Sequence, residues 1–129
     1  MKFVGDKVTF QDDITVEDRG DYLRVVVCGA ANLEKVLTAI DEANKIFQEK
    51  PFTKILYDFR TMVGGISAID RIRLGLYAAR FRYYDLRVAL LYRTEHIETL
   101  RFLETYLQDR GILFRIFSNE TQALQWFVA

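Results

Sequence analysis

Hydrophobic positions near the N-terminus form short β-rich runs, whereas those that follow recur at helical spacing. Ile14–Glu17 and Tyr22–Val27 are separated by turn residues at 17–21, so we predict that they pair as a hairpin. From Asn32, a candidate N-cap, apolar residues recur every three or four positions as far as Lys50-Pro51. This pattern predicts one long helix that covers a face of a sheet.

The rest of the chain alternates between predicted strands and predicted helices. Three apolar runs are typical of strands buried on both faces, as in a parallel sheet: Lys54–Phe59, Arg87–Tyr92 and Ile112–Phe117. Helices are predicted over about 67–84, from a Thr94 cap to Gly111, and after a cap at Ser118 or Asn119. The order predicts an α/β fold: a mixed, mainly parallel β-sheet with packed helices and a β-rich N-terminus. No linker or repeat interrupts the pattern, so 1–129 is predicted to be one domain.

Composition and charge narrow the classes of function. A chain of 129 residues that is 50% hydrophobic suits a globular domain. The 18 basic and 18 acidic residues cancel, which argues against binding to nucleic acid or to an anionic membrane through overall charge. No apolar run approaches the roughly 18 to 20 residues of a transmembrane segment, and no secretory signal is visible, so we expect a cytoplasmic protein. The single cysteine, Cys28, cannot form an internal disulfide, and its apolar flank predicts a small core residue.

The junction after the Lys54–Phe59 strand is the first candidate site. In open α/β sheets, ligands and partners are received beyond the carboxyl ends of strands. Here the chain passes through Arg60 to Gly64-Gly65 and then to Ser67 at a helix start. The two glycines are typical of a tight turn, or alternatively of a loop whose amides hold an anion. Arg60, Gly64, Gly65 and Ser67 are therefore candidate binding residues.

The predicted 67–84 helix carries more apolar residues than one docking face needs. We expect one stripe to dock on the sheet, comprising Ile69, Ile72, Leu76, Ala79 and Tyr83. Outside it lie Leu74, Tyr77 and Phe81, beside Arg73, Arg80 and Tyr84. Intramolecular packing, a partner or oligomer interface, and a ligand pocket all explain this excess. The residues predicted to take part in recognition are Arg73, Tyr77, Arg80, Phe81 and Tyr84.

Positive charge gathers in the same region. Six arginines lie between residues 71 and 93, with Asp85 as the accompanying acid. Arginine forks suit carboxylates and phosphates, so the segment is either a site for an anionic partner or a solvated face with structural ion pairs.

Three segments carry a resemblance to a known family. The strand end Leu56–Arg60, the strand Val88–Leu91 and the tail Arg115–Trp126 resemble the STAS domain of anti-sigma factor antagonists, and more specifically the SpoIIAA-like family. The resemblance covers roughly residues 10 to 128. It implies a regulatory or binding role, and the family's relation to lipid-binding domains of the CRAL-TRIO type implies a second possibility, a lipid carrier.

Ser67 falls at the position where signalling STAS proteins carry a phosphorylatable serine or threonine. That residue usually follows an aspartate and is soon followed by a glycine, whereas Ile66 precedes Ser67 here and Ala68-Ile69 follow it. Ser67 is therefore either a plain N-cap or a candidate phosphorylation site.

Enzymatic chemistry finds little support in the sequence. The only histidine, His96, stands beside Glu95 and Glu98 at positions unsuited to closing one metal site, so no metal or cofactor is expected. Neither Ser67 nor Cys28 is flanked as an activated nucleophile.

The sequence thus predicts a non-enzymatic protein-interaction or regulatory module. It would act through the 60–84 loop and helix on a protein partner or on a second copy of itself in a homodimer. The alternative is a carrier of a small apolar or amphipathic ligand such as a lipid, with an arginine on the ligand's acid group.

Overall fold

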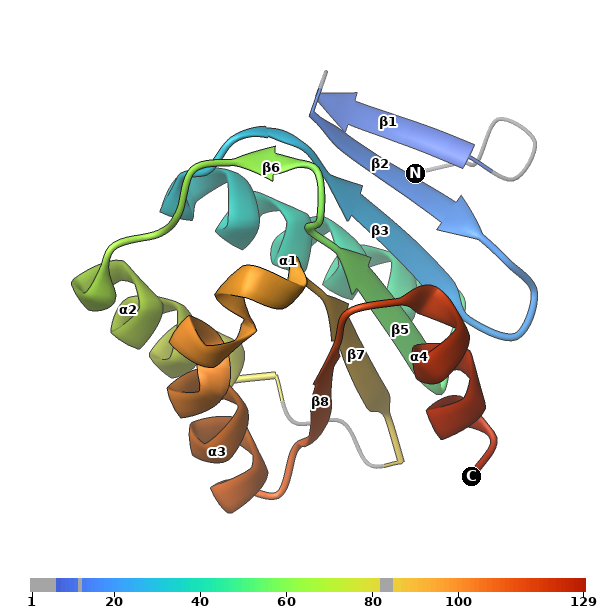
Figure 1. The fold of residues 1–129 in the computed structure, drawn as a ribbon. Coiled ribbons are helices and arrows are strands. Elements are labelled where there is room, and N and C mark those ends of the chain that lie inside the picture. The colour runs from blue at the N-terminus through green and yellow to red at the C-terminus, as the bar shows by residue number, and fades with distance from the viewer. Residues whose placement is uncertain (1–6, 12, 82–84) are drawn as a thin grey trace.

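Six strands form one sheet, and helices cover both of its faces (Figure 1). A computed structural model describes residues 7–11, 13–81 and 85–129. The strands of the sheet are β1 (Lys7–Gln11), β2 (Ile14–Asp18), β3 (Leu23–Val27), β5 (Lys54–Asp58), β7 (Arg87–Leu91) and β8 (Leu113–Phe117). They lie in the order β1-β2-β3-β5-β7-β8.

The sheet is antiparallel at one end and parallel at the other. β1, β2 and β3 pair antiparallel, and the predicted hairpin is confirmed by the pairing of Ile14 with Val27 and of Asp18 with Leu23. From β3 through β5 and β7 to β8 every pairing is parallel. Two short strands, β4 (Gly29–Ala30) and β6 (Met62–Val63), form a separate parallel pair beyond the ends of β3 and β5. The mixed, mainly parallel sheet is as predicted.

The helices divide between the two faces of the sheet (Figure 1). They are α1 (Leu33–Glu49), α2 (Ala68–Ala78), the 3-10 helix η1 (Thr94–Leu100) with α3 (Arg101–Asp109), and α4 (Glu120–Phe127). α1, α2 and α3 share the larger core, while α4 packs on the opposite face. Neighbouring residues of β5 show this division, because Ile55 belongs to the larger core and Leu56 to the core under α4. On α4, Phe127 is buried and Trp126 is half-buried.

Local capping follows the sequence with one exception. Asn32, Ser67 and Asn119 each accept a hydrogen bond from a backbone N–H three residues ahead, as N-caps do. The predicted Thr94 cap is wrong, because Thr94 is the first residue of η1 and its cap position, Arg93, makes no side-chain capping bond. The 3-10 geometry of this first segment explains the mismatch, since the α-helix begins only at Arg101.

Cys28 is half-buried instead of lying in the core. Its Sγ is 3.9 Å from Oδ1 of Asp13, and the buried Lys35 ammonium pairs with the other oxygen of that carboxylate at 2.7 Å. The apolar run that precedes Cys28 ends one residue earlier, at the fully buried Val27.

α2 is shorter than predicted. The helix ends at Ala78, and Arg80 follows in a turn. Phe81 has left the helix, and the predicted recognition residue Tyr84 and docking residue Tyr83 lie outside the described residues.

The face that α2 turns inward also differs from the predicted one, although Ala79, just after the helix, packs against the larger core as expected. Ile69, Ile72 and Leu76, expected to dock on the sheet, are 63%, 49% and 56% exposed. Leu74 and Gly75 are buried instead.

The close packing of α2 on α3 explains this orientation. A Cβ added to Gly75 would lie 3.3 Å from Cδ2 of Tyr106 and 3.4 Å from Cδ1 of Leu103, so the missing side chain lets α3 approach closely. On the other side, the Tyr77 hydroxyl donates a hydrogen bond to Asp41 of α1. α2 is therefore held between α1 and α3, and three large aliphatic side chains point outward.

Candidate functional site

A pocket of about 300 Å³ opens at the carboxyl ends of β5 and β7, where the topology of the sheet predicted a site. Its walls come from the strand ends, the loop before α2, α2 itself, and η1 with α3. The lining residues are Phe59, Met62, Gly64, Gly65, Ile66, Arg71, Leu74, Leu90, Tyr92, Arg93, His96, Thr99, Leu100 and Leu103.

The pocket combines an apolar interior with a cationic side. Most of its lining side chains are aliphatic or aromatic and belong to the larger core. The polar lining side chains are Arg71, Arg93, His96 and Thr99. No aspartate or glutamate is among the described residues that line it.

Arg93 fixes the loop that forms one wall. Its Nη1 donates to the Met62 carbonyl oxygen at 2.8 Å and its Nη2 to that of Gly64 at 3.1 Å. The guanidinium carbon lies 5.9 Å from the centre of the Tyr92 ring. Within the described part of the chain, the buried Nε of Arg93 has no hydrogen-bond partner. Arg93 therefore anchors the loop and keeps one donor unused.

Arg71 holds the same loop from α2. Its Nη1 donates to the Ile66 carbonyl oxygen at 2.7 Å. Across residues 7–11, 13–81 and 85–129, no ion pair joins Arg71 or Arg93 to an acid. The loop carbonyls supply dipoles but no net charge, so the two guanidinium charges at the pocket stay uncompensated there.

The sequence placed Arg71 and Arg93 in a basic segment but did not select them as site residues. A signal for Arg93 was present, because it follows the end of β7 as Arg60 follows the end of β5. The carboxyl ends of parallel neighbours meet at one edge of a sheet.

Gly64 and Gly65 do line the pocket, and Gly64 adopts the left-handed φ of +84° that a tight turn with glycine uses. This φ is what the tight-turn interpretation expects at Gly64. Ser67 lies at the exposed start of α2, where its Oγ accepts a hydrogen bond from the Asp70 N–H at 3.2 Å. It is an N-cap, and its phosphorylation stays a prediction.

Arg60 lies elsewhere, on the side of the sheet that α4 covers. Its Nε and Nη2 donate to the two carboxylate oxygens of Asp58 at 3.0 and 2.9 Å. Nη2 of Arg24 on β3 also donates to Asp58, at 2.8 Å, and to Glu120 at the start of α4, at 3.1 Å. Burial alone would raise the pKa of Asp58, but hydrogen bonds from Arg60 and the charges of Arg60 and Arg24 outweigh it and hold that pKa below its usual value. Arg60 thus belongs to an ion-pair network rather than to the pocket.

The remaining predicted residues of the 60–84 region separate into surface and interior. Arg73 is exposed and pairs with Asp70 at 3.1 Å, and Arg80 is exposed with its guanidinium carbon 5.6 Å from the centre of the Tyr77 ring. Tyr77 is bound to α1, and the hydrogen bond to Asp41 raises its pKa. Phe81 is half-buried and makes an edge contact with Tyr77 at 5.4 Å between ring centres.

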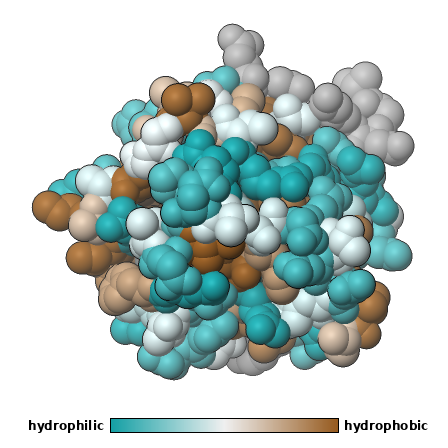
Figure 2. All heavy atoms as spheres, viewed as in Figure 1, coloured by the Kyte–Doolittle hydropathy of each residue, from teal (hydrophilic) through white to brown (hydrophobic). Residues whose placement is uncertain are grey.

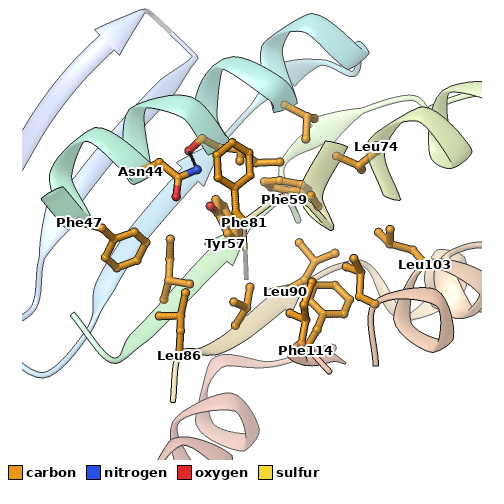
Figure 3. Close-up of a pocket in the computed structure, with 17 residues that line it drawn as sticks. Asn44, Phe47, Tyr57, Phe59, Leu74, Phe81, Leu86, Leu90, Leu103 and Phe114 are labelled. Carbon is orange, nitrogen blue, oxygen red and sulfur yellow. Dashed lines mark hydrogen bonds between the residues drawn. The ribbon is translucent and has the colours of Figure 1, made fainter. Parts of the chain in front are cut away.

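Phe81 lines a second, smaller cavity of about 80 Å³ between α1, α2, α3 and the sheet (Figure 3). Figure 3 shows Phe47 and Asn44 of α1 across from Leu74 and Leu103, with Phe59 and Leu90 between them. Four side chains line both cavities: Phe59, Leu74, Leu90 and Leu103. The pocket at the strand ends is therefore separated from the inner cavity only by a shared apolar wall.

The outward side of α2 forms an apolar surface, here called the α2 ridge, made of Ile69, Ile72 and Leu76. Their spacing of three and four residues places them on one helix face. Val63 of β6, 69% exposed, precedes the same helix. Figure 2 shows hydrophobic side chains along the left edge of the molecule, where α2 lies. Sequence periodicity had found this stripe but assigned it to the core.

The described residues contain no group of three or more His, Cys, Asp or Glu placed to hold a metal ion. His96 is exposed, with its ring centre 6.5 Å from that of Tyr92. No described helix combines the length and the apolar character needed to cross a membrane.

Comparison with known proteins shows the fold. No protein-family model matches the sequence, and a search of curated proteins gives no match. Among solved structures, an anti-sigma factor antagonist from Mycobacterium paratuberculosis is 14% identical, with a TM-score of 0.63 over 90% of this chain and 93% of that one. A DUF3478 family protein with a SpoIIAA-like fold from Shewanella loihica is 22% identical, with a TM-score of 0.54 over 88% of this chain and 91% of that one. The predicted STAS/SpoIIAA-like fold is confirmed.

Proposed function

We propose that this chain is a cytoplasmic, non-enzymatic regulatory module that binds a protein partner through the α2 ridge and the loop before it. The observation that carries the proposal is the exposure of Ile69, Ile72 and Leu76 in one row on α2. Large aliphatic side chains gathered on one exposed helix face are typical of a surface that another protein covers. Residues 1–129 would act as one domain.

The surroundings of the ridge favour a partner with acidic groups. Arg73 lies between the ridge residues in sequence, and Arg80 follows the end of α2; both are exposed. An apolar centre with a charged rim is the usual anatomy of a protein interface. The predicted recognition roles of Arg73 and Arg80 fit this rim, whereas Tyr77 and Phe81 support the helix from the inside.

The structural neighbours point to the same class of function. The mycobacterial protein is named as an antagonist of an anti-sigma factor, and its fold covers most of this chain. We therefore propose a protein partner in preference to a substrate.

Site-specific photo-crosslinking in the cells that express the protein tests this proposal. A photoreactive residue at Ile72 should give a discrete crosslinked species, and the same residue at exposed Gln48 on α1 is the matched control. Ile69→Ser should weaken the crosslink at position 72 by several-fold. A crosslink of twice the chain mass would identify a homodimer as the partner complex. Equal labelling at positions 72 and 48, or none at 72, would contradict the proposed surface.

The two faces of α2 should respond differently to truncation. Leu74→Ala removes a buried side chain and should cost about 3 kcal/mol of unfolding free energy. Leu76→Ala removes an exposed one and should change it by less than about 0.5 kcal/mol. Urea unfolding measures both values, and a large loss for Leu76→Ala would show that this face is covered by the protein itself.

Ser67 is the proposed regulatory position of this surface. Its hydroxyl is exposed at the N-terminus of α2, where the helix dipole favours a phosphate, and Ile69 follows two residues later. Ser67→Asp keeps an N-cap acceptor and adds charge, whereas Ser67→Ala loses the cap at a cost of about 1 kcal/mol. We expect Ser67→Asp to alter the crosslink at position 72 while the stability stays near that of the unmodified protein. No change in the crosslink would argue that Ser67 is a cap alone.

A further inference from the structure

We infer that the pocket at the ends of β5 and β7 binds a small organic anion with an apolar body, whose anionic group meets Arg71 and Arg93. The inference does not depend on the proposed partner surface, because the α2 ridge points away from the core that lines this pocket. It assigns a ligand class to a site that fold similarity leaves open.

Charge is the first reason for an anion. Each guanidinium carries five N–H donors. Arg71 uses one on the Ile66 carbonyl, and Arg93 uses two on the Met62 and Gly64 carbonyls. The Nε of Arg93 has no acceptor among the described residues. The two guanidinium groups therefore have unused donors, and none of the described lining residues is an acid. Such a site suits a carboxylate or a phosphate.

Preorganisation is the second reason. Both arginines bind carbonyl groups of one short loop, residues 62–66, so their side chains are already fixed in place. Arg93 also lies over the Tyr92 ring. A ligand that meets immobilised donors loses less conformational entropy than one that must order flexible side chains.

The apolar lining sets the other half of the ligand. Phe59, Leu74, Leu90 and Leu103 form the wall that the pocket shares with the inner cavity, as Figure 3 shows from the inner side. An anion without an attached apolar group would leave this wall in contact with water. An alkyl or aryl group attached to the anion would cover it, which is favourable in proportion to the apolar area removed from water.

The volume limits the size. About 300 Å³ equals roughly ten waters at about 30 Å³ each, and lies at the lower end of the range for small-molecule sites. A ligand of about ten non-hydrogen atoms, such as octanoate, matches that volume. A dinucleotide is several times larger and does not fit.

Isothermal titration calorimetry of the full chain with four probes tests this assignment. Octanoate and octyl phosphate share the anion and the apolar body, 1-octanol lacks the charge, and inorganic phosphate lacks the body. We expect both amphipathic anions to bind at least tenfold more tightly than 1-octanol and than inorganic phosphate. The ratio between octanoate and octyl phosphate then tells which anionic group the arginines prefer. Equal binding of 1-octanol, or of inorganic phosphate, would overturn the inference.

Variants place the binding in this pocket. Arg71→Gln should lower the affinity for octanoate at least tenfold. Arg73→Gln, on the exposed side of the same helix, should leave that affinity unchanged. Thr99→Glu, which adds a carboxylate to the lining without removing a loop hydrogen bond of either arginine, should abolish binding even where Arg71→Gln folds poorly. Ile72→Ser should have no effect, since it alters only the ridge. If Thr99→Glu binds octanoate like the unmodified protein, the ligand site lies elsewhere and the inference fails.

Discussion

Two pairs of arginines on opposite sides of the sheet have opposite electrostatic surroundings. Under α4, Arg24 and Arg60 both bind the carboxylate of Asp58. At the pocket on the other side, Arg71 and Arg93 bind loop carbonyls only, within the described residues. The first pair is neutralised by the fold itself, while the second keeps its charge available to an incoming group. The same residue type is thus structural in one place and a candidate for binding in the other.

Sequence distance gave no hint of this difference. Asp58 lies two residues before Arg60, and 34 residues separate it from Arg24. Glu120, which closes the network from α4, is 96 residues away from Arg24. The pairing exists because β3 and β5 are neighbours in the sheet and α4 begins above them.

Removing the carboxylate of Asp58, which both Arg24 and Arg60 bind, should have the largest effect on stability. Asp58→Ala leaves two arginines without their shared partner in a largely buried place, so we expect a loss of about 3 kcal/mol of unfolding free energy. Glu98→Ala is the control, because Glu98 pairs with Arg101 at the surface and should cost less than about 1 kcal/mol. Urea unfolding compares them. Equal losses would show that the Asp58 network contributes no more than a surface pair.

Lowering the pH should remove the stabilisation by the Asp58 ion pairs over a range of pH values. The folded-state pKa of Asp58 is lower than its ordinary value of 3.8, so the unfolded chain binds the proton more readily. The stabilisation is present above about pH 4 and is lost as the pH falls through the folded-state pKa. As the pH is lowered below about 4, the unfolding free energy should therefore fall less steeply for Asp58→Asn than for the unmodified protein. Parallel curves would contradict the role of Asp58.

Supplying a carboxylate to the unpaired side should have the smallest effect on stability. Thr99→Glu places an acid among the residues that line the pocket with Arg71 and Arg93. Because the new pair is partly exposed, we expect a gain of at most about 1 kcal/mol, measured by urea unfolding. Glu introduced at the exposed Gln48, which lies on α1 and does not line the pocket, is the control for added negative charge. A loss of stability at position 99 alone would show that the arginine charges are already compensated.

Part of the candidate site could be predicted from the sequence, and the rest could not, for definite reasons. Gly64 and Gly65, which line the pocket, could be selected because strand ends and turn glycines have local signatures. Arg71 and Arg93 were missed as site residues because nothing local distinguishes an arginine that binds carbonyls from one that binds a carboxylate. The role of Arg60 changed for the same reason.

α2 shows the same limit in its packing. Helical spacing grouped Ile69, Ile72 and Leu76 correctly on one face, and that apolar face was predicted to dock on the sheet. The structure turns it outward, because Gly75 allows close contact with Tyr106 of α3. Large apolar residues outside a core are the signal that remains for an interface.

The sequence by itself determined strands β2, β3, β5, β7 and β8, the caps at Asn32 and Ser67, and the STAS/SpoIIAA-like order of elements, while it left the last cap between Ser118 and Asn119. These depend on residues a few positions apart, so short-range periodicity and turn chemistry are sufficient to set them. Only the tertiary structure decided which face of α2 is buried and which arginines have acidic partners. Both depend on contacts between segments distant in the chain, and periodicity fixes which side chains share a face without fixing what that face meets.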